Sequence, residues 1–574
     1  MILLLIQVAL SQYFVKTLVP LGADIWAYSI EDIKQTLGAS GGINLSAIII
    51  FSVLLLITVL AFVMLSNRIK IKGVWAFVLF AVFAAASVIN FSRTVKKLSP
   101  GQEYSNNLSL NKSWYFFDKS YRHFFPPSTE EDIYTDYETA DNMFAYVDEK
   151  NYPFLHTIDS TEDVLSPFFT RDSLPPNIVI LLVEGLGRAF TNEGAYLGNF
   201  TPFIDSLARK SLYWENFLSE GGRTFAALPS LLSSLPFAKN GFNEMGDAMP
   251  KHLSLLNLLQ HNGYNSSFYY GGDSHFDNMD IFLQKNSINT INDEKTFPDG
   301  YTKMPGKNGA TWGYGDKELV RRFFETKQTV QQPYVNVVLT VSTHSPFLIN
   351  EQDQYLAKFE NRMTEIQLTD DVKQQRRNYR NQFASILFLD DAVRDFINQY
   401  KKRPDYNNTV FLITGDHRMP EIPMSSKIDR YHVPLLIYSP LLKRTAKFKS
   451  VSTHFDITPS LLAWLKNSYH IKTPSIASWI GSGLDTTRAF RNIHSYPIMQ
   501  TKNDLVDFIM GNYMLNGDDL YQISPNMDLD PAPDEEKRNQ LQSRFNKFLS
   551  KNNRFIANPS LLIPDSLVQH YTLK

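Results

Sequence analysis

Short runs of apolar residues that alternate with helical patterns constrain the fold of this chain more than any other feature. After Pro175 the strand-like runs Ile178–Val183, Val335–Val341 and Thr409–Thr414 are separated by stretches with helical periodicity. Runs that are apolar at nearly every position are typical of parallel strands buried on both faces. The alternation therefore predicts an α/β fold of βαβ units, with a mainly parallel central sheet and helices on both faces.

Polar residues suited to chemistry follow each of these runs. Glu184 follows the first, His344 comes shortly after the second, and Asp416 and His417 end the third. The carboxyl ends of parallel strands meet at one edge of a sheet, where such folds place their sites. A carboxylate and an imidazole together suit manganese, zinc or magnesium better than calcium. For Glu184 alone, a helix-capping carboxylate is the alternative.

A glycine pair precedes a second group of candidate residues, Gly221-Gly222-Arg223-Thr224, at the start of the helical stretch 224–234. A tight turn before a helix offers backbone N–H groups to an anion, and Arg223 adds a fixed positive charge. Thr224 suits the role of helix N-cap. It is also a candidate nucleophile, provided that a bound metal lowers the pKa of its hydroxyl.

Composition narrows the choice of metal and partner. The 574 residues include no cysteine, which excludes thiolate ligands and leaves nitrogen and oxygen donors. The formal net charge of −2 gives no basic character, so nucleic acid is not an expected partner.

Two uncharged apolar stretches predict a membrane anchor. Residues 45–65 and 73–92 are each long enough to cross a hydrocarbon layer of roughly 30 Å as a helix, and residues 1–20 are a further candidate. Two buried helices of a globular core are the alternative. Arg68, Lys70 and Lys72 lie between the two stretches, so the positive-inside rule places this loop in the cytoplasm and the rest of the chain outside it.

These patterns predict four units. Residues 1–98 form a membrane anchor, 99–174 an extracytoplasmic helical connector, 175–500 the catalytic domain, and 501–574 a mixed α/β subdomain. The connector is expected to hold helices near 112–124 and 130–150, and the last unit a hairpin around Asn516-Gly517.

Six motifs in this order resemble the alkaline phosphatase/sulfatase-like superfamily, and within it the lipoteichoic acid synthase and phosphoglycerol transferase group. The resemblance covers roughly residues 176–465. The motifs are Asn177 to Gly185, Gly222-Arg223-Thr224, Gly271 to Phe276, Trp312 to Asp316, Ser342 to Phe347 and Thr414 to His417.

The resemblance implies roles for seven residues. Glu184, Thr224, Asp416 and His417 would hold a divalent ion, manganese in the synthases, and Thr224 would be the nucleophile. His344 would lie near the transferred phosphoryl group with Arg223, and Asp273 would contact glycerol hydroxyls. The tryptophan and arginine that follow the acidic residue in the synthases have no clear counterpart after Asp273.

A second metal site built from His275, His432 and His454 is a further hypothesis, as in two-metal phosphatases. The segment around His454 also resembles a structural helix start, which is the alternative. Asp390 and Asp391 are interpreted as solvated or helix-capping acids.

The predicted function is therefore that of a multi-pass protein of the cell membrane with an extracytoplasmic catalytic domain. It would move glycerol phosphate from phosphatidylglycerol, or a similar phospholipid, to a glycan or polymer acceptor through a phosphothreonine intermediate. A phosphoethanolamine transferase, a phosphodiesterase and a non-enzymatic envelope scaffold are the alternatives. A sulfatase activity is disfavoured because residues 224–229 lack the Cys/Ser-x-Pro-x-Arg motif.

Overall fold

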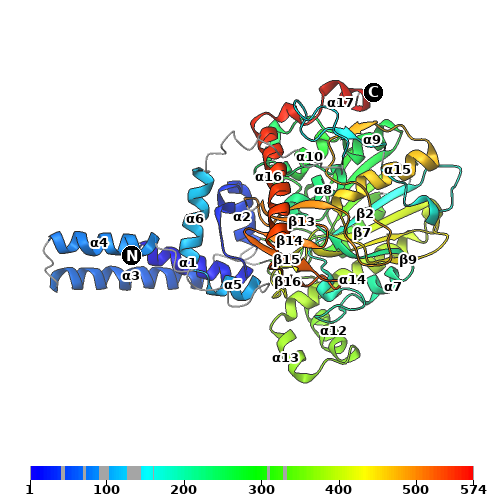
Figure 1. Ribbon diagram of the computed structural model, residues 1–574. Helices are drawn as coiled ribbons and strands as arrows, with labels where there is room; N and C mark the ends of the chain where they lie inside the picture. Colours follow the sequence, from blue (N-terminus) through cyan, green and yellow to red (C-terminus); the bar gives the residue numbers. More distant parts are fainter. Residues whose placement is uncertain are drawn as a thin grey trace.

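A computed structural model describes residues 2–39, 45–68, 73–88, 103–125, 144–159, 161–306, 310–326, 332–503 and 505–572. The described residues form a nine-stranded central sheet with helices on both faces (Figure 1). In spatial order its strands are β10 (Ser452–Thr453), β3 (Leu212–Leu218), β8 (His432–Tyr438), β7 (Thr409–Gly415), β2 (Asn177–Val183), β6 (Tyr334–Leu339), β4 (Asn265–Tyr270) and β5 (Thr290–Asn292), with β9 (Ala446–Phe448) paired to β3.

The sheet is parallel except at β8, which confirms a mainly parallel sheet. β8 runs antiparallel to both β7 and β3. The segment between β7 and β8 contains only the short 3-10 helix η11 (Ile428–Arg430). A parallel return usually passes through a crossover helix, and residues 416–431 contain no α-helix, which favours the antiparallel direction.

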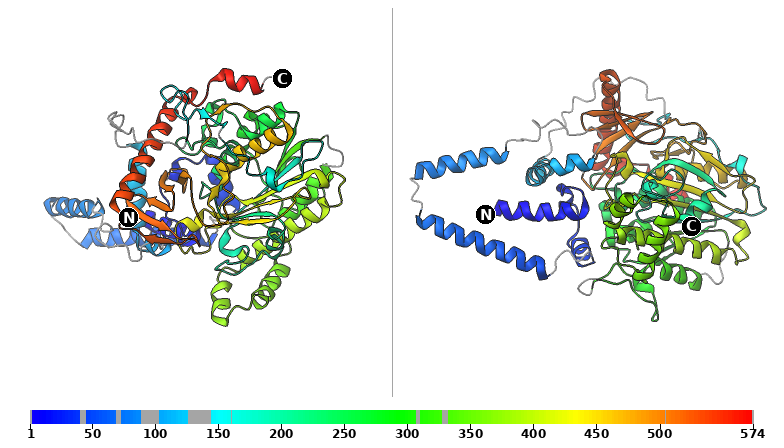
Figure 2. Two further views of the ribbon diagram at one scale, coloured as in Figure 1. Left: turned by 45° about the vertical axis from the view of Figure 1, so that its right-hand side comes forward. Right: turned by 90° about the horizontal axis from the view of Figure 1, so that it is seen from below.

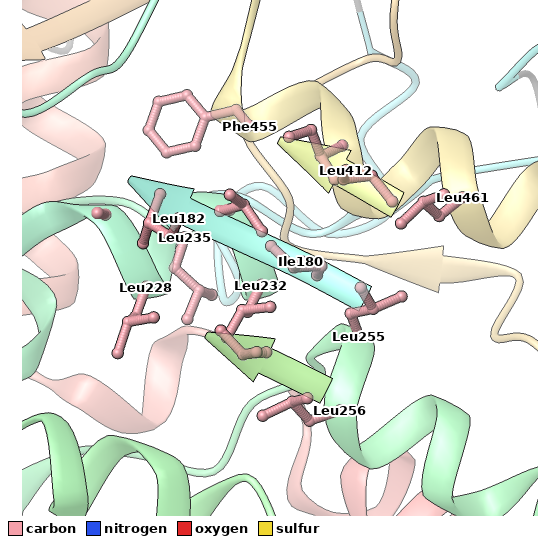
Figure 3. Close-up of a cluster of buried hydrophobic side chains, with 14 of the residues drawn as sticks. Ile180, Leu182, Leu228, Leu232, Leu235, Leu255, Leu256, Leu412, Phe455 and Leu461 are labelled. Carbon is pink, nitrogen blue, oxygen red and sulfur yellow. The ribbon is translucent and has the colours of Figure 1, made fainter. Parts of the chain in front are cut away.

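The central strands separate two apolar cores. Ile178, Ile180 and Leu182 of β2 pack on one face, whereas Val179 and Leu181 pack on the other. Figure 3 shows the first core, where leucines from α8, α9 and α15 cover β2 and β7. The helices of this face are α8 (Ala227–Ser233), α9 (Leu255–His261), α10 (Met279–Lys285) and α15 (Ile457–Tyr469); those of the other face are α7 (Pro202–Ala208), α11 (Asp316–Thr326), α12 (Gln352–Glu365) and α14 (Arg380–Tyr400).

Two helical predictions differ in detail. The sequence of residues 376–401 predicts one helix, but residues 376 and 377 belong to α13 (Asp370–Arg377), and α14 begins only at Arg380. Asp390 and Asp391 are buried on α14 rather than solvated. Asp390 does cap a helix, but not its own: its carboxylate accepts from the Phe203 and Ile204 N–H groups of α7, both at 2.9 Å.

A second, antiparallel sheet precedes the long C-terminal helix. It consists of β12 (Ser495–Met499), β13 (Leu505–Met510), β14 (Tyr513–Asn516), β15 (Asp519–Ile523) and β16 (Leu529–Pro531). The predicted hairpin around Asn516-Gly517 is confirmed between β14 and β15. The chain then ends with α16 (Glu535–Ala557), η13 (Pro559–Leu561) and α17 (Asp565–Thr572).

The N-terminal part is helical. Its elements are α1 (Ile2–Thr17), η1 (Ala23–Trp26), α2 (Ile30–Ala39), α3 (Leu45–Arg68), α4 (Gly73–Val88), α5 (Glu103–Ser109) and α6 (Lys112–Phe124). α3 and α4 project away from the globular part in both views (Figures 1 and 2). Within the described ranges, no helix has both the length and the apolar character that crossing a membrane requires, so the predicted spans are not confirmed. Residues 69–72 of the predicted cytoplasmic loop and most of the predicted helix 130–150 lie outside the described residues.

Candidate active site

Three chain segments bring the predicted nucleophile and metal ligands to one edge of the sheet. Glu184 follows β2 directly, and Asp416 follows β7 directly. The two strands are neighbours, with Val183 opposite Gly415. The third segment is the loop after β3, which leads to Thr224 at the first position of the 3-10 helix η6 (Thr224–Ala226).

The hydroxyl of Thr224 lies between two carboxylates. Its Oγ1 is 2.8 Å from Asp416 Oδ2 and 3.1 Å from Glu184 Oε2. His417 Nε2 lies 3.4 Å from the same Asp416 oxygen and 3.6 Å from Glu184 Oε1. One ligand atom from each of Glu184, Asp416 and His417 falls within 4.8 Å of the others, and all three residues are buried. This is the arrangement expected of a metal site with the nucleophile beside it.

The charges of the two carboxylates require compensation. Burial raises the pKa of Glu184 well above its usual range, and the adjacent Asp416 charge raises it further. Two buried acids at this separation repel each other unless a cation or a shared proton is present. Two carboxylate donors, one imidazole and a hydroxyl are a donor set that a divalent cation of the manganese, zinc or magnesium type fits.

Local backbone geometry fixes the ligands. Asp416 Oδ1 accepts hydrogen bonds from the N–H groups of Gly185 and His417, both at 2.8 Å. Gly185 takes a positive φ of 68°, which a side chain would strain. His417 Nδ1 lies 3.0 Å from the Arg418 carbonyl, and this contact leaves Nε2 directed at the carboxylates.

The capping interpretation of Thr224 is wrong. The helix cap is Arg223, and no side chain there makes a capping hydrogen bond. The predicted helix 224–234 is η6 followed by the seven-residue α8 (Ala227–Ser233). The Thr224 hydroxyl instead makes hydrogen bonds with Glu184 and Asp416. A nucleophile activated by a metal at these carboxylates would need this position.

His344 lies on the same side of the sheet. Burial lowers the pKa of His344 to about 4, and the charges of Arg223, His417 and Asp416 also act on its ring. The ring lies against Trp312, with centroids 3.8 Å apart. His344 is therefore neutral at neutral pH, with one ring nitrogen able to donate a hydrogen bond and the other able to accept one.

Asp273 does not belong to the group of buried acids. It is paired with Lys295 at 2.9 Å and accepts a hydrogen bond from the His275 N–H at 3.0 Å. Burial acts to raise the pKa of Asp273, but the hydrogen bonds from Lys295 and from the His275 N–H, together with the nearby positive charge, outweigh it and the pKa is lowered. Asp273 is thus a charged, partly exposed carboxylate at the same edge.

The three histidines of the second-metal hypothesis each have a separate partner. His275 is exposed beside Asp280, His432 Nε2 lies 2.9 Å from the Glu215 carbonyl, and His454 Nε2 lies 2.9 Å from the Gly415 carbonyl. Within the described ranges they form no metal-binding group. His454 does lie at a structural helix start, because Thr453 and Asp456 make a reciprocal capping box there.

Sequence reasoning missed Glu220, which supports the loop that carries Thr224. Its carboxylate accepts from the Phe455 N–H at 3.1 Å and lies 3.6 Å from His454 Nδ1. Burial raises the pKa of Glu220 to about 8. A carboxylate directly before the glycine pair, at the end of a buried strand, was the available signal.

The fold and site together define an alkaline phosphatase-like α/β protein with a candidate metal site at the carboxyl edge of its sheet. The Sulfatase family model matches residues 176–468, and the chain belongs to this family. The matched region contains Glu184, Thr224, Asp416 and His417. Residues 224–229 lack the Cys/Ser-x-Pro-x-Arg motif, so membership of this family does not imply a sulfatase activity.

Two curated relatives each match less than half of the chain. The lipoteichoic acid synthase-like protein YvgJ of Bacillus subtilis is 24% identical over 252 residues, which cover 42% of this chain and 36% of that protein. A lipoteichoic acid synthase of Staphylococcus aureus is 26% identical over 249 residues, covering 42% and 35%. The matches thus span little more than a third of these relatives.

Solved structures support the fold. The lipoteichoic acid synthase LtaP from Listeria monocytogenes superposes with a TM-score of 0.51 at 19% identity, covering 70% of this chain and 98% of that chain. An alkaline phosphatase superfamily protein from Vibrio parahaemolyticus gives 0.51 at 21% identity, covering 72% and 93%.

Proposed function

We propose that the chain is a metal-dependent phosphoglycerol transferase that uses Thr224 as its nucleophile. The observation that carries the proposal is the Thr224 hydroxyl, held within hydrogen-bond distance of two buried carboxylates beside His417. The similarity to lipoteichoic acid synthases supports phosphatidylglycerol as the donor and a glycan or glycerol phosphate polymer as the acceptor.

Glu184, Asp416, His417 and Thr224 would hold the divalent ion, for which manganese is the first candidate. Bound there, the ion supplies Lewis acidity, which makes the Thr224 hydroxyl acidic enough to react. Arg223 supplies permanent positive charge for the phosphoryl oxygens, and neutral His344 supplies a hydrogen bond to the same group.

The proposed reaction is a double displacement. Thr224 Oγ1 bonds to the phosphorus of phosphatidylglycerol, the phosphorus–oxygen bond to diacylglycerol breaks, and the hydroxyl proton leaves with diacylglycerol. An acceptor hydroxyl then attacks the phosphothreonine, takes the glycerol phosphate group, and returns its proton to Thr224. Asp273, charged and partly exposed, is proposed to contact the glycerol hydroxyls.

We also propose that the protein works at the outer face of a cell membrane, with the region 1–98 as its attachment, 99–174 as a connector and the regions 175–500 and 501–574 as the catalytic part. Large apolar side chains on α3 and α4 support contact with lipid. Examples are Phe62, 70% exposed, and Phe77, 71% exposed. Side chains of this kind need an apolar partner.

The experiment that tests the function is mass spectrometry of the purified protein with Mn²⁺ and phosphatidylglycerol. We expect an added glycerol phosphate on Thr224 and release of diacylglycerol, both lost in Thr224→Ala. Thr302→Ala, which removes an exposed threonine elsewhere, is the matched control and should keep both products.

An adduct that forms with phosphatidylethanolamine but not with phosphatidylglycerol would keep the mechanism and replace the donor. Diacylglycerol and free glycerol phosphate without an acceptor product would favour a phosphodiesterase. An absence of any adduct or product with either lipid would overturn the proposal and favour a scaffold.

A further inference from the structure

The segment between α1 and α2, residues 18–29, lies against the catalytic part of the chain although more than four hundred residues separate them. Asn503 Nδ2 donates to the Ala23 carbonyl at 2.9 Å. The ammonium of Lys502 lies 4.2 Å from the ring centroid of Tyr28, a cation–π contact. Asp24 Oδ1 accepts from the Gly22 N–H at 3.0 Å and shapes the turn between these contacts.

The catalytic side of this contact continues directly to the loop that carries Thr224. The Met499 N–H donates to the Glu220 carbonyl at 2.9 Å, and the Gly222 N–H donates to the Met499 carbonyl at 3.0 Å. A Cβ on Gly222 would lie only 2.5 Å from the Gln500 carbonyl oxygen. Residues 499–503 therefore connect the N-terminal segment to the nucleophile loop through backbone contacts, which hold their spacing closely.

Lys502 joins this arrangement to the loop that contains Asp273. Its side chain is fully buried, and its ammonium lies 2.7 Å from Glu244 and 2.8 Å from Asp277. Asp277 is four residues after Asp273, in the loop between β4 and α10. The Tyr28 ring thus contacts the same ammonium that pairs with Glu244 and Asp277.

The charge of Arg223 also acts on Tyr28. Burial raises the pKa of Tyr28, and the positive charges of Arg223 and Lys502 oppose that rise. Burial acts to lower the pKa of Arg223, but Tyr13, Tyr28 and nearby carboxylates outweigh it and raise the pKa. Tyr28 remains partly accessible, and its ring sits on Lys502, two residues after Gln500, which packs against the glycine that precedes Arg223.

We propose that the active site is composite, and that Tyr28 of the N-terminal segment binds the phosphodiester headgroup of the lipid donor together with Arg223. The inference rests on the proposed function. A phosphodiester attacked by Thr224 places its non-bridging oxygens beside Arg223, where the phenol O–H donates to the same anion. Tyr28 is then a specificity-determining residue, because its hydroxyl makes one of the proposed contacts with the donor headgroup.

The test compares Tyr28→Phe with the unmutated full chain in phosphatidylglycerol vesicles with Mn²⁺. The phenylalanine ring keeps the contact with Lys502 and removes only the hydroxyl. We expect KM for the donor to rise about tenfold, with kcat changed less than twofold, since one hydrogen bond to a charged group is lost. Tyr121→Phe, on the exposed face of α6, is the matched control and should leave both constants unchanged.

A second measurement uses the absence of cysteine. Tyr28→Cys and Tyr121→Cys each create a single thiol. Mn²⁺ and glycerol phosphate should slow maleimide labelling at position 28 several-fold and leave position 121 unaffected. An active wild-type protein with an unchanged KM in Tyr28→Phe, or with no protection of position 28, would overturn the inference alone. A wild-type protein that releases no diacylglycerol would overturn the proposed function itself, and the inference with it.

Discussion

At the scale of single residues, the repulsion between Glu184 and Asp416 makes stability depend on a bound cation. An ion that binds only the folded protein stabilises it by about 2.7 kcal/mol at a hundredfold excess over its Kd. Asp416→Asn removes one charge, so we expect the midpoint of thermal unfolding to be unchanged or higher without metal, and the rise caused by Mn²⁺ to disappear. Asp273→Asn, outside the cluster, should keep that rise; an equal rise in Asp416→Asn would contradict the metal site.

Buried histidines predict a loss of stability in acid. Burial lowers the pKa of His252 to about 4, and its ring is stacked on Phe282 away from the metal ligands. The unfolded protein binds a proton near pH 6.5 and the folded protein only near pH 4, so stability falls as the pH drops between these values. The full effect is about 3 kcal/mol for this residue.

His252→Phe keeps an aromatic ring at this position and removes the titration. We expect a shallower fall in the free energy of unfolding from pH 6.5 to pH 4, measured by denaturant titration at several pH values. His470→Phe, at an exposed helix end, is the control and should keep the slope of the wild-type protein. Identical slopes in all three proteins would show that His252 is protonated equally in both states.

At the scale of elements, the loop between β3 and η6 is held by a close backbone approach at Gly222. Gly222→Ala would push against the Gln500 carbonyl oxygen and the Arg430 side chain. We expect a loss of about 1–3 kcal/mol in the free energy of unfolding, together with a lower kcat, because the loop sets the position of Thr224. Gly73→Ala, where no atom lies within 4 Å of the added Cβ, should change neither quantity. A stable, fully active Gly222→Ala protein would show that the loop adjusts freely.

The elements that sequence predicts best are those with a local cause. β2 and β7 are apolar at nearly every position, and Glu184 and Asp416 follow them directly, so both the strands and their meeting at one edge were predictable. The antiparallel direction of β8 was not predictable, because it depends on the path of the irregular segment between β7 and β8.

The parts of the site that sequence could not show depend on distant contacts. Tyr28 is an ordinary tyrosine in a polar stretch, and Lys502 an ordinary lysine after a strand. Only the pairing of β12 and the packing of residues 18–29 bring them together near Arg223. The same holds for Asp390, which lies on α14 but caps α7.

At the scale of the whole molecule, α3 and α4 expose more apolar surface than a protein surrounded by water tolerates. Both helices stand clear of the globular part (Figure 1), and Leu56 and Phe62 of α3 are 58% and 70% exposed. Burying apolar area yields about 25 cal/mol per Å², so contact with lipid acyl chains would stabilise this surface strongly. The N-terminal segment that carries Tyr28, residues 18–29, is followed by α2 and then by α3, so lipid contact and donor binding would occur close together in the chain.

The last prediction follows from this arrangement. Leu56→Asp combined with Phe62→Asp should lower the fraction of protein that remains with phosphatidylglycerol vesicles after a high-salt wash, measured by flotation, because charges in an apolar layer are costly. Turnover of phosphatidylglycerol in vesicles should fall in parallel, whereas the stabilisation by Mn²⁺ should persist, since the metal ligands are untouched. Leu174→Asp, an apolar residue 59% exposed outside the helices, is the control. Equal retention of the wild-type protein, the double variant and Leu174→Asp would exclude α3 as the lipid contact. The composite active site would then need another explanation of how it reaches the lipid donor.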